Sequence, residues 1–243
     1  MKLLAIDSGN SRIKWGLCAD ARWVTRGVLP VAESADLRDQ LAAVPEPDRI
    51  VVAHVASAQT ALNISGALER FAVEANWIVS RHEQCGVRSS YALPAQLGPD
   101  RWAALIGARH LYDGAAVVVN AGTTLTVDAL SAEGIFLGGF IVPGYTLMRQ
   151  SLSGGTQRLT LQDGHFKFFP DNTGDAIASG ACNALAGAID RMVRYMQEAG
   201  EGDAMILISG GDAPVLASRL NTGAQVVDNL VLEGLVRIGT NDV

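Results

Sequence analysis

The first seventeen residues carry the clearest pattern of apolar and polar positions in the chain. Leu3 to Ile6 form an apolar run, as a buried strand does, and the run ends at Asp7. The next residues, Ser8-Gly9-Asn10-Ser11, have turn chemistry, and Arg12 to Leu17 then alternates polar and apolar positions. The pattern predicts a buried strand, a tight polar turn and a second strand.

This turn is a candidate phosphate-binding site. Gly9 allows the backbone N–H groups to come close to an anion, and a turn of this kind can cradle phosphate oxygens. Asp7, at the end of the first strand, has the chemistry to hold a metal ion that shields those phosphates. An ordinary hairpin with a solvated Asp7 and Lys14 explains this stretch equally well.

The same pattern returns in the middle of the chain, at 116–130. Set beneath 3–17, this stretch aligns without a gap, so that Asp7 falls on Asn120 and Gly9 on Gly122. Identity is low, so the repeat is one of pattern rather than of sequence. It predicts two similarly built halves, each with a phosphate-facing turn, and a nucleotide triphosphate held in a cleft between the two turns.

The remaining pattern of the first half, 1–113, is that of an α/β unit. Strands are expected at 22–29, 49–55 and 77–80, and helices at 35–43, 59–76 and 101–112. His54, inside the second of these strands, is interpreted as a core histidine with its hydrogen bonds satisfied. Residues 85–101 are expected to form a long loop, and long loops in compact domains are often functional.

The second half, 114–243, continues with expected strands at 134–142, 204–209 and 225–227. Helices are expected at 145–152, 173–199, 215–220 and 230–238, with a structured loop at 153–172. The many small residues of the longest helix indicate close packing, inside the fold or against a second subunit. Gly210-Gly211 follows a buried strand, where the backbone can approach a flat ligand such as adenine; a plain strand-to-helix turn remains an equal alternative.

Asp100 and Arg101 stand at the end of the expected loop, and the sequence allows two roles for each of them. The local sequence favours Asp100 as the N-cap of the following helix. A carboxylate there can also accept the proton of a substrate hydroxyl that attacks phosphorus, and the two roles can coexist. Arg101 is either a surface residue or a partner for an acidic substrate.

Composition narrows the class of protein. The chain has 243 residues, of which 49% are hydrophobic, so it has ample core for one large domain or two small ones. Its net charge of −6, without a basic run, argues against nucleic-acid binding. Cys18, Cys85 and Cys182 fit no disulfide or metal spacing and favour a reducing cytoplasm. No apolar run approaches the ~18–20 residues of a membrane helix, and the N-terminal run is too short for a signal peptide.

Several motifs in order resemble those of type III pantothenate kinases, in the acetate and sugar kinase/Hsp70/actin superfamily. The resemblance runs nearly end to end. Its motifs are Asp7-Ser8-Gly9-Asn10-Ser11, Gly86-Val87 through Tyr91, Leu97-Gly98-Pro99-Asp100-Arg101-Trp102, Gly122-Thr123, Gly138-Gly139-Phe140-Ile141-Val142-Pro143-Gly144, and Thr173 with Ala176, Ile177 and Gly180. No single motif is decisive, but their order and spacing together are specific.

This resemblance implies an α/β fold of two ribonuclease H-like (actin-like) half-domains with ATP between them. It implies that Mg²⁺ accompanies ATP, that Asp100 is the general base for the primary hydroxyl of pantothenate, and that the protein is a homodimer requiring K⁺ or NH₄⁺. The residues implied to contact ATP are Asp7, Ser8, Gly9, Asn10, Ser11, Arg12, Ile13, Lys14, Thr123, Gly210 and Gly211. Those implied to line the pantothenate pocket are Tyr91, Gly98, Pro99, Asp100, Arg101 and Thr173.

One position departs from the family. Asn120 stands where the family usually has an Asp that binds the monovalent cation, and Thr124 stands where Ala is common. An amide oxygen can coordinate a cation without supplying formal charge, so the departure puts the potassium site in question. Two alternatives to a pantothenate kinase remain: another small-molecule kinase of the superfamily, against which Tyr91 and the 98–101 loop argue, and a non-catalytic regulator that has kept the fold.

Overall fold

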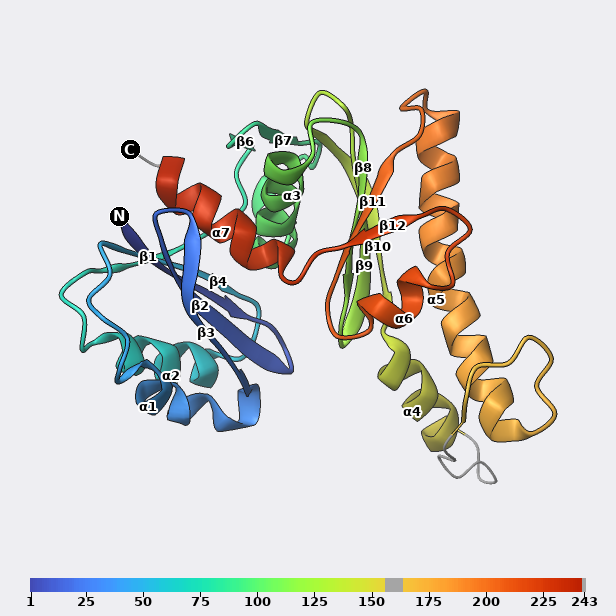
Figure 1. Ribbon diagram of the computed structural model, residues 1–243, viewed down its shortest axis with the longest axis horizontal. Coiled ribbons are helices and arrows are strands. Elements are labelled where there is room, and N and C mark those ends of the chain that lie inside the picture. The colour runs from blue at the N-terminus through green and yellow to red at the C-terminus, as the bar shows by residue number, and fades with distance from the viewer. Residues whose placement is uncertain (156–163, 242–243) are drawn as a thin grey trace. The chain divides into compact units, whose positions relative to one another are not determined.

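The computed structural model describes residues 1–155 and 164–241, which fall into two compact units. The first unit contains Met1–Tyr112 together with the segment from Asn229 onward, and the second contains Asp113–Asp228. Figure 1 shows the elements of each unit. Part of the loop expected at 153–172 lies outside the described residues.

The first unit is built on a five-stranded sheet with the strand order β3-β2-β1-β4-β5. β2 pairs antiparallel with β1 and with β3, whereas β4 runs parallel to β1 and to β5. The strands are β1 (Lys2–Ser8), β2 (Arg12–Ala19), β3 (Arg22–Pro30), β4 (Arg49–His54) and β5 (Ala75–Trp77). The predicted hairpin is therefore confirmed as β1–β2, with β1 in the middle of the sheet.

Alternate side chains of β1 pack against helices on the two opposite faces of the sheet. Leu4 and Ile6 belong to a core with residues of α1 (Leu37–Leu41) and α2 (Ala58–Leu68). On the opposite side, a Cβ at Gly239 would collide with Leu3, which brings helix α7 (Leu230–Asn241) directly onto the sheet. A strand covered on both faces must be apolar throughout, and this explains the run at Leu3–Ile6. The unit is completed by η1 (Val31–Asp36), β6 (Glu83–Gln84), β7 (Val87–Ser89), η2 (Pro94–Gln96) and α3 (Pro99–Leu111).

Helix α7 packs against α3 through two glycines. A Cβ at Gly107 would collide with the carbonyl oxygen of Leu230, and a Cβ at Gly234 would collide with that of Ala103. Trp23 Nε1 also donates a hydrogen bond of 2.9 Å to Glu233. The expected halves, 1–113 and 114–243, assigned this closing helix to the second half; in the structure it packs in the first unit because only glycines permit this close contact.

The second unit repeats the topology of the first. Its strands lie in the order β12-β11-β8-β9-β10, with β8, β9 and β10 antiparallel and β11 and β12 parallel to β8. They are β8 (Ala116–Ala121), β9 (Thr124–Leu130), β10 (Ile135–Pro143), β11 (Met205–Ser209) and β12 (Ala224–Val226). Leu185, Ile189 and Met192 of α5 (Thr173–Glu198) join the core of this sheet; the other helices are α4 (Tyr145–Gly155) and α6 (Ala213–Ala217). The two similar α/β halves predicted from the repeat are present.

The two hairpins differ by one residue. Asp7 pairs with Lys14 in the first, whereas Asn120 pairs with Thr126 in the second. In the gapless alignment Lys14 falls on Val127, so the second hairpin is one residue shorter after the turn. A shift of one residue reverses the face of each side chain, and Thr126 therefore takes the place that corresponds to Lys14.

Other expected boundaries shift for identifiable reasons. The second helix was expected to reach residue 76 but ends at Leu68, where Arg70 Nη1 donates hydrogen bonds to the carbonyls of Leu41 and Val44. The expected loop at 85–101 contains β7 and η2, and α3 begins within it at Pro99, because proline suits the first helical position.

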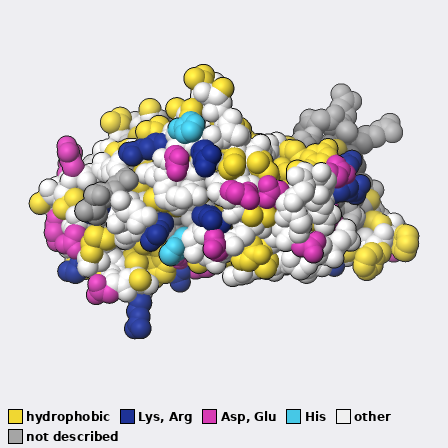
Figure 2. All heavy atoms as spheres, turned by 90° about the horizontal axis from the view of Figure 1, so that it is seen from above, with side chains coloured by type: hydrophobic (Ala, Val, Ile, Leu, Met, Phe, Trp, Pro, Cys, Tyr) yellow, Lys and Arg dark blue, Asp and Glu magenta, His cyan; other side chains and the backbone are white. Residues whose placement is uncertain are grey.

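No helix within residues 1–155 and 164–241 is long and apolar enough to cross a membrane. On the face drawn in Figure 2, basic and acidic side chains are interspersed rather than gathered by sign.

Candidate functional site

The turn between β1 and β2 consists of Gly9, Asn10 and Ser11 and leaves polar groups at the surface. Gly9 N–H donates a 3.1 Å hydrogen bond to the carbonyl of Arg12, which closes the turn. The carbonyl of Ser11 accepts from Val31 N–H at 2.9 Å, which ties the turn to the end of β3. Asn10, Ser11 and Arg12 are exposed. Gly9 therefore shapes the turn, and the exposed residues after it are the ones available to an anion.

Asp7 lies at the end of β1, just before this turn, and only 7% of its surface is exposed. Burial raises the pKa of this carboxyl to about 7, against the opposing charge of Lys14, and the negative charge of Asp100 raises it further. Lys14 is the cross-strand partner of Asp7 in the β1–β2 register. The start of α3 lies near the end of β1, because a Cβ at Gly98 would stand 4.0 Å from Val55 Cγ1 and Val55 N–H donates to the carbonyl of Ser8 at 2.9 Å.

Asp100 is the second residue of α3, and it does not cap that helix. The N-cap position is Gly98, without a side-chain hydrogen bond, so the N-cap prediction for Asp100 is wrong. Instead, Asp100 Oδ1 accepts a 2.9 Å hydrogen bond from Arg101 N–H, and a Cβ at Gly98 would stand only 2.6 Å from the same oxygen. Burial raises the pKa of Asp100, while the backbone and charge of Arg101 lower it.

The neighbouring residues of the 98–101 segment are enclosed. Arg101 is 7% exposed, so the interpretation of it as a surface residue is wrong. Pro99 occupies the first turn of α3, and Tyr91 is half-buried with its N–H donating to Ser89 Oγ at 3.2 Å. The first unit thus contains the predicted turn residues and every predicted pantothenate residue except Thr173.

His54 also belongs to this site, and the sequence pattern did not place it there. Its Nδ1 lies 3.0 Å from Ser8 Oγ, and the next residue, Val55, donates its N–H to the carbonyl of Ser8 at 2.9 Å. Its interpretation as a satisfied histidine is confirmed, and burial lowers its pKa. The signal was available in principle: parallel strands bring their carboxyl ends to one edge, and His54 ends β4 as Ser8 ends β1.

The second unit brings together Asn120, Thr123 and the Gly210-Gly211 turn. Asn120, near the end of β8, pairs with Ser209, the last residue of β11. Gly210 has φ of +108°, and a Cβ there would collide with the backbone of Ala121. Gly144 is pressed equally closely onto the second hairpin turn, where its N–H donates to the carbonyl of Thr123 at 2.9 Å. Two glycines thus allow neighbouring backbones to meet at the second turn.

Thr173 is the exposed first residue of α5, whose N-cap is Asn172. It lines a groove of about 740 Å³ in the second unit, together with residues of α4, the preceding loop and the small-residue side of α5. The groove residues include Met148, Leu152, Asn172, Ala176 and Gly180.

Within the part of the chain that the structure describes, no group of three or more His, Cys, Asp or Glu side chains is arranged to hold a metal ion. A transition-metal centre built from protein ligands is therefore not among its features there. A hard cation held by one carboxylate together with ligand oxygens needs no such group.

Comparison with known proteins identifies the relatives of this chain. A family model described as type III pantothenate kinase matches residues 3–195. A type III pantothenate kinase from Aromatoleum aromaticum is 49% identical over 99% of this chain and 98% of its own length, and one from Nitrosospira multiformis is 44% identical over 97% and 90%.

Solved structures show the fold alone, because their identities are low. A protein from Campylobacter jejuni, provisionally described as a Baf family transcriptional activator, has a TM-score of 0.60 at 21% identity, covering 97% of this chain and 96% of that one. A glucokinase from an Antarctic psychrotroph has a TM-score of 0.52 at 13% identity and covers 99% of both chains. The two-unit α/β architecture is therefore that of sugar kinases and actin-like proteins, and the sequence matches show that this chain belongs to the type III pantothenate kinase family.

Proposed function

We propose that this chain transfers the γ-phosphate of ATP to the primary hydroxyl of pantothenate, giving 4′-phosphopantothenate, with Asp100 as general base. The observation that supports this assignment of roles is the closeness of the start of α3 to the end of β1: a Cβ at Gly98 would stand 2.6 Å from Asp100 Oδ1 and 4.0 Å from Val55, whose N–H donates to the carbonyl of Ser8 at 2.9 Å. A candidate base near a turn suited to phosphates fits the proposed reaction. Phosphoryl transfer requires mainly positioning and neutralisation of charge, and a base at this place supplies the remaining step.

The first hairpin is proposed to bind the ATP phosphates through residues 7–14. Exposed Asn10, Ser11 and Arg12 are the contacts, and Lys14 adds positive charge next to Asp7. Ser8 is fully buried and hydrogen-bonded to His54, so its role is to hold the turn in place. The N–H of Gly9 is already used inside the turn, so its role is likewise to shape the backbone.

Asp100 is proposed to accept the hydroxyl proton of pantothenate. Burial raises its pKa toward the working pH, which makes a carboxylate a stronger base. Its Oδ1 accepts a hydrogen bond from Arg101 N–H, which orients it. We propose that the Arg101 side chain binds the pantothenate carboxylate. Gly98, Pro99 and Tyr91 are proposed as further pantothenate contacts from the first unit, and Thr173 as a contact from the second.

Magnesium is proposed to accompany ATP at Asp7. The fit is good because Mg²⁺ in kinases is bound by one or two carboxylates together with phosphate oxygens, and Asp7 is a nearly enclosed carboxyl at the phosphate turn. When bound, this ion neutralises charge on the phosphates. A pKa of about 7 means that Asp7 is only partly ionised near neutral pH in the free protein, so cation and proton compete for it.

From the second unit, we infer that Thr123 contacts ATP and that the Gly210-Gly211 turn lies against adenosine. Asn120 is proposed as a ligand for K⁺ or NH₄⁺ through its neutral amide oxygen. Its half-buried position at a turn packed by Gly144 and Gly210 supports this. We also infer a homodimer, in line with the family resemblance and with strongly exposed Phe168 and Phe169 beside α5.

The test is a coupled assay on purified protein with pantothenate, ATP and Mg²⁺, with and without K⁺. Formation of 4′-phosphopantothenate supports the proposed reaction, and dependence on K⁺ supports the cation site. Formation of product without K⁺ supports the proposed kinase reaction and rejects the requirement for a monovalent cation. Absence of product from folded protein under every ion rejects the reaction and favours a regulator or a kinase with another substrate.

A further inference from the structure

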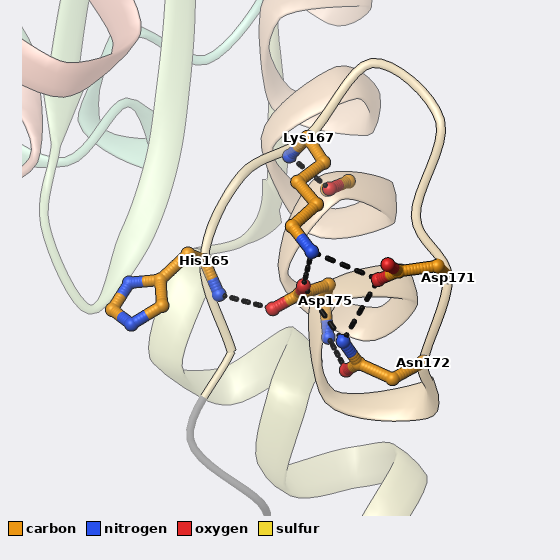
Figure 3. A network of polar contacts seen from close by, with 6 residues as sticks. His165, Lys167, Asp171, Asn172 and Asp175 are labelled. Atoms are coloured by element: carbon orange, nitrogen blue, oxygen red, sulfur yellow. Dashed lines mark hydrogen bonds and ion pairs between the residues drawn. The ribbon is translucent and has the colours of Figure 1, made fainter.

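A connected polar network joins the loop before α5 to the first turns of that helix (Figure 3). Lys167 Nζ lies 2.8 Å from Asp171 Oδ1 and 2.8 Å from Asp175 Oδ2, so one ammonium bridges two carboxylates. Asn172 Nδ2 donates to the same two oxygens, at 3.1 and 2.8 Å. Asp171 belongs to the loop and Asp175 to the helix, so the bridge spans the junction between them.

The backbone of the loop is fastened to the same helix. His165 N–H donates to Asp175 Oδ1 at 2.8 Å, and Lys167 N–H donates to Ser179 Oγ at 2.9 Å. A Cβ at Gly164 would collide with the carbonyl of Gly174, which shows how closely the two backbones meet. Arg219 also stacks on the Phe166 ring at 4.0 Å. The loop therefore lies folded back along α5.

Asp175 is the centre of these contacts. Only 6% of its surface is exposed, and its two oxygens accept from Lys167, Asn172 and His165. These donors, Lys167 first, hold the pKa of Asp175 well below its usual range. The same ammonium lowers the pKa of Asp171, and both carboxylates raise the pKa of Lys167. The network thus keeps its charges throughout the neutral range.

We propose that Lys167 is a positioning residue for the pantothenate reaction: by bridging Asp171 and Asp175 it fixes the segment that carries Thr173. Thr173 is flanked by the N-cap Asn172 on one side and by Gly174 and Asp175 on the other, and each of these neighbours is held by the contacts described above. This inference rests on the proposed function, because it assumes that Thr173 meets pantothenate.

Loss of the ammonium should disturb the junction without unfolding the helix. Asn172 Oδ1 still caps α5 by accepting from Asp175 N–H at 2.9 Å, independently of Lys167. Without the ammonium, the carboxylates of Asp171 and Asp175 repel each other across the Asn172 amide, which donates to both of them. The Lys167 side chain is 45% exposed and that of Asp171 is 75% exposed, so this ion pair contributes little to global stability. Asp175 is nearly buried, but it keeps its hydrogen bonds from Asn172 and His165 when the ammonium is removed.

The experiment compares Lys167→Met with Lys167→Arg, which retains a cation able to bridge two carboxylates. Arg38→Met is the matched control, because it removes an exposed ion pair with Glu69 on the first unit. Hydrogen exchange of the amides at 172–176 reports on the network whether or not the protein is active. Steady-state kinetics then separates KM for pantothenate from KM for ATP.

We expect Lys167→Met to speed exchange at 172–176 and to raise KM for pantothenate roughly tenfold, with KM for ATP within about twofold, since small misplacements of a binding residue are costly. Lys167→Arg and Arg38→Met should resemble the parent. Unchanged exchange overturns the network's role, and faster exchange with an unchanged pantothenate KM overturns the positioning role. A parent protein that does not phosphorylate pantothenate rejects the proposed function, while exchange still decides whether Lys167 holds the junction.

Discussion

Asp7 and Lys14 are direct cross-strand partners at the turn end of the β1–β2 hairpin. Burial raises the pKa of Asp7 to about 7 even though the Lys14 ammonium acts in the opposite direction. The positive charge of Lys14 therefore does not compensate for the desolvation of the Asp7 carboxylate. A protein that keeps a charged group in such a place usually does so for function rather than for stability.

This carboxyl makes stability depend on pH. The folded chain holds the Asp7 proton up to about pH 7, whereas the unfolded chain releases it near 3.8. The folded state binds more protons between these values, so the contribution of Asp7 to stability is present below 3.8 and is lost as pH rises through about 7. Asp7→Asn removes this loss. We expect the Tm of Asp7→Asn, relative to the parent, to increase by several degrees from about pH 5 to about pH 8.5 without nucleotide.

Thermal unfolding at a series of pH values measures this difference. Asp39→Asn, at an exposed position of α1, is the matched control for replacing a carboxyl that is not buried. A Tm difference for Asp7→Asn that stays constant across the range would contradict the buried, protonated carboxyl.

Replacing Asp100 by Asn should abolish most turnover while leaving binding intact. Asn Oδ1 can still accept the Arg101 N–H hydrogen bond, so the start of α3 keeps its geometry. Loss of a general base typically lowers kcat by about 10²–10⁴-fold. Calorimetric titration with pantothenate and ATP should give affinities close to those of the parent. Equal kcat for Asp and Asn at this position would refute the base assignment.

The contact between α3 and α7 predicts a strong effect on stability far from the chemistry. Gly234→Ala places a Cβ against the Ala103 carbonyl, where neither backbone can move without displacing its helix. Overpacking of this kind costs about 1–3 kcal/mol, or a fall in Tm of several degrees. Gly187→Ala is the matched control, because a Cβ there meets nothing within 4 Å and a helical glycine replaced by alanine gains about 0.5–1 kcal/mol. Similar Tm shifts in both variants would argue against the packing.

Local patterns predicted the elements of this fold well, and tertiary contacts explain where they did not. The hairpin at 3–17 and its repeat at 116–130 were both found, because alternation and turn residues are encoded locally. The placement of α7 was not, because it depends on contacts with residues far away in the sequence, such as those of Gly234 with Ala103 and of Gly239 with Leu3. The one-residue difference between the two hairpins was not predicted either, since it depends on the register of the strands rather than on composition.

At the candidate site, too, the sequence predicted what local motifs encode and missed what depends on tertiary contacts. Asp7, Asp100 and Arg101 were selected from their motifs, and in the structure all three belong to the first unit, Asp7 near the end of β1 and the other two at the start of α3. The capping reading of Asp100 failed because α3 begins at Pro99, one residue before it. His54 was treated as part of the core, although the parallel pairing of β4 with β1 places it on Ser8. A local pattern shows where each strand ends but not which strands pair, so the contact of His54 with Ser8 follows only once β4 is known to lie beside β1.

The departure at Asn120 leads to a prediction about the monovalent cation. Asn120 supplies a neutral oxygen at the end of β8, next to Ser209 and the glycine-packed second turn. Asn120→Asp adds one negative charge near the proposed cation, an interaction worth about 1 kcal/mol where solvent screens it, and should lower the K⁺ concentration for half-maximal rate roughly fivefold. Asn120→Leu removes the oxygen and should leave a rate that no longer responds to K⁺. Initial rates measured against K⁺, at constant ionic strength, check both variants. If the parent, Asp and Leu proteins share one K⁺ dependence, Asn120 is not a cation ligand and any monovalent ion acts elsewhere.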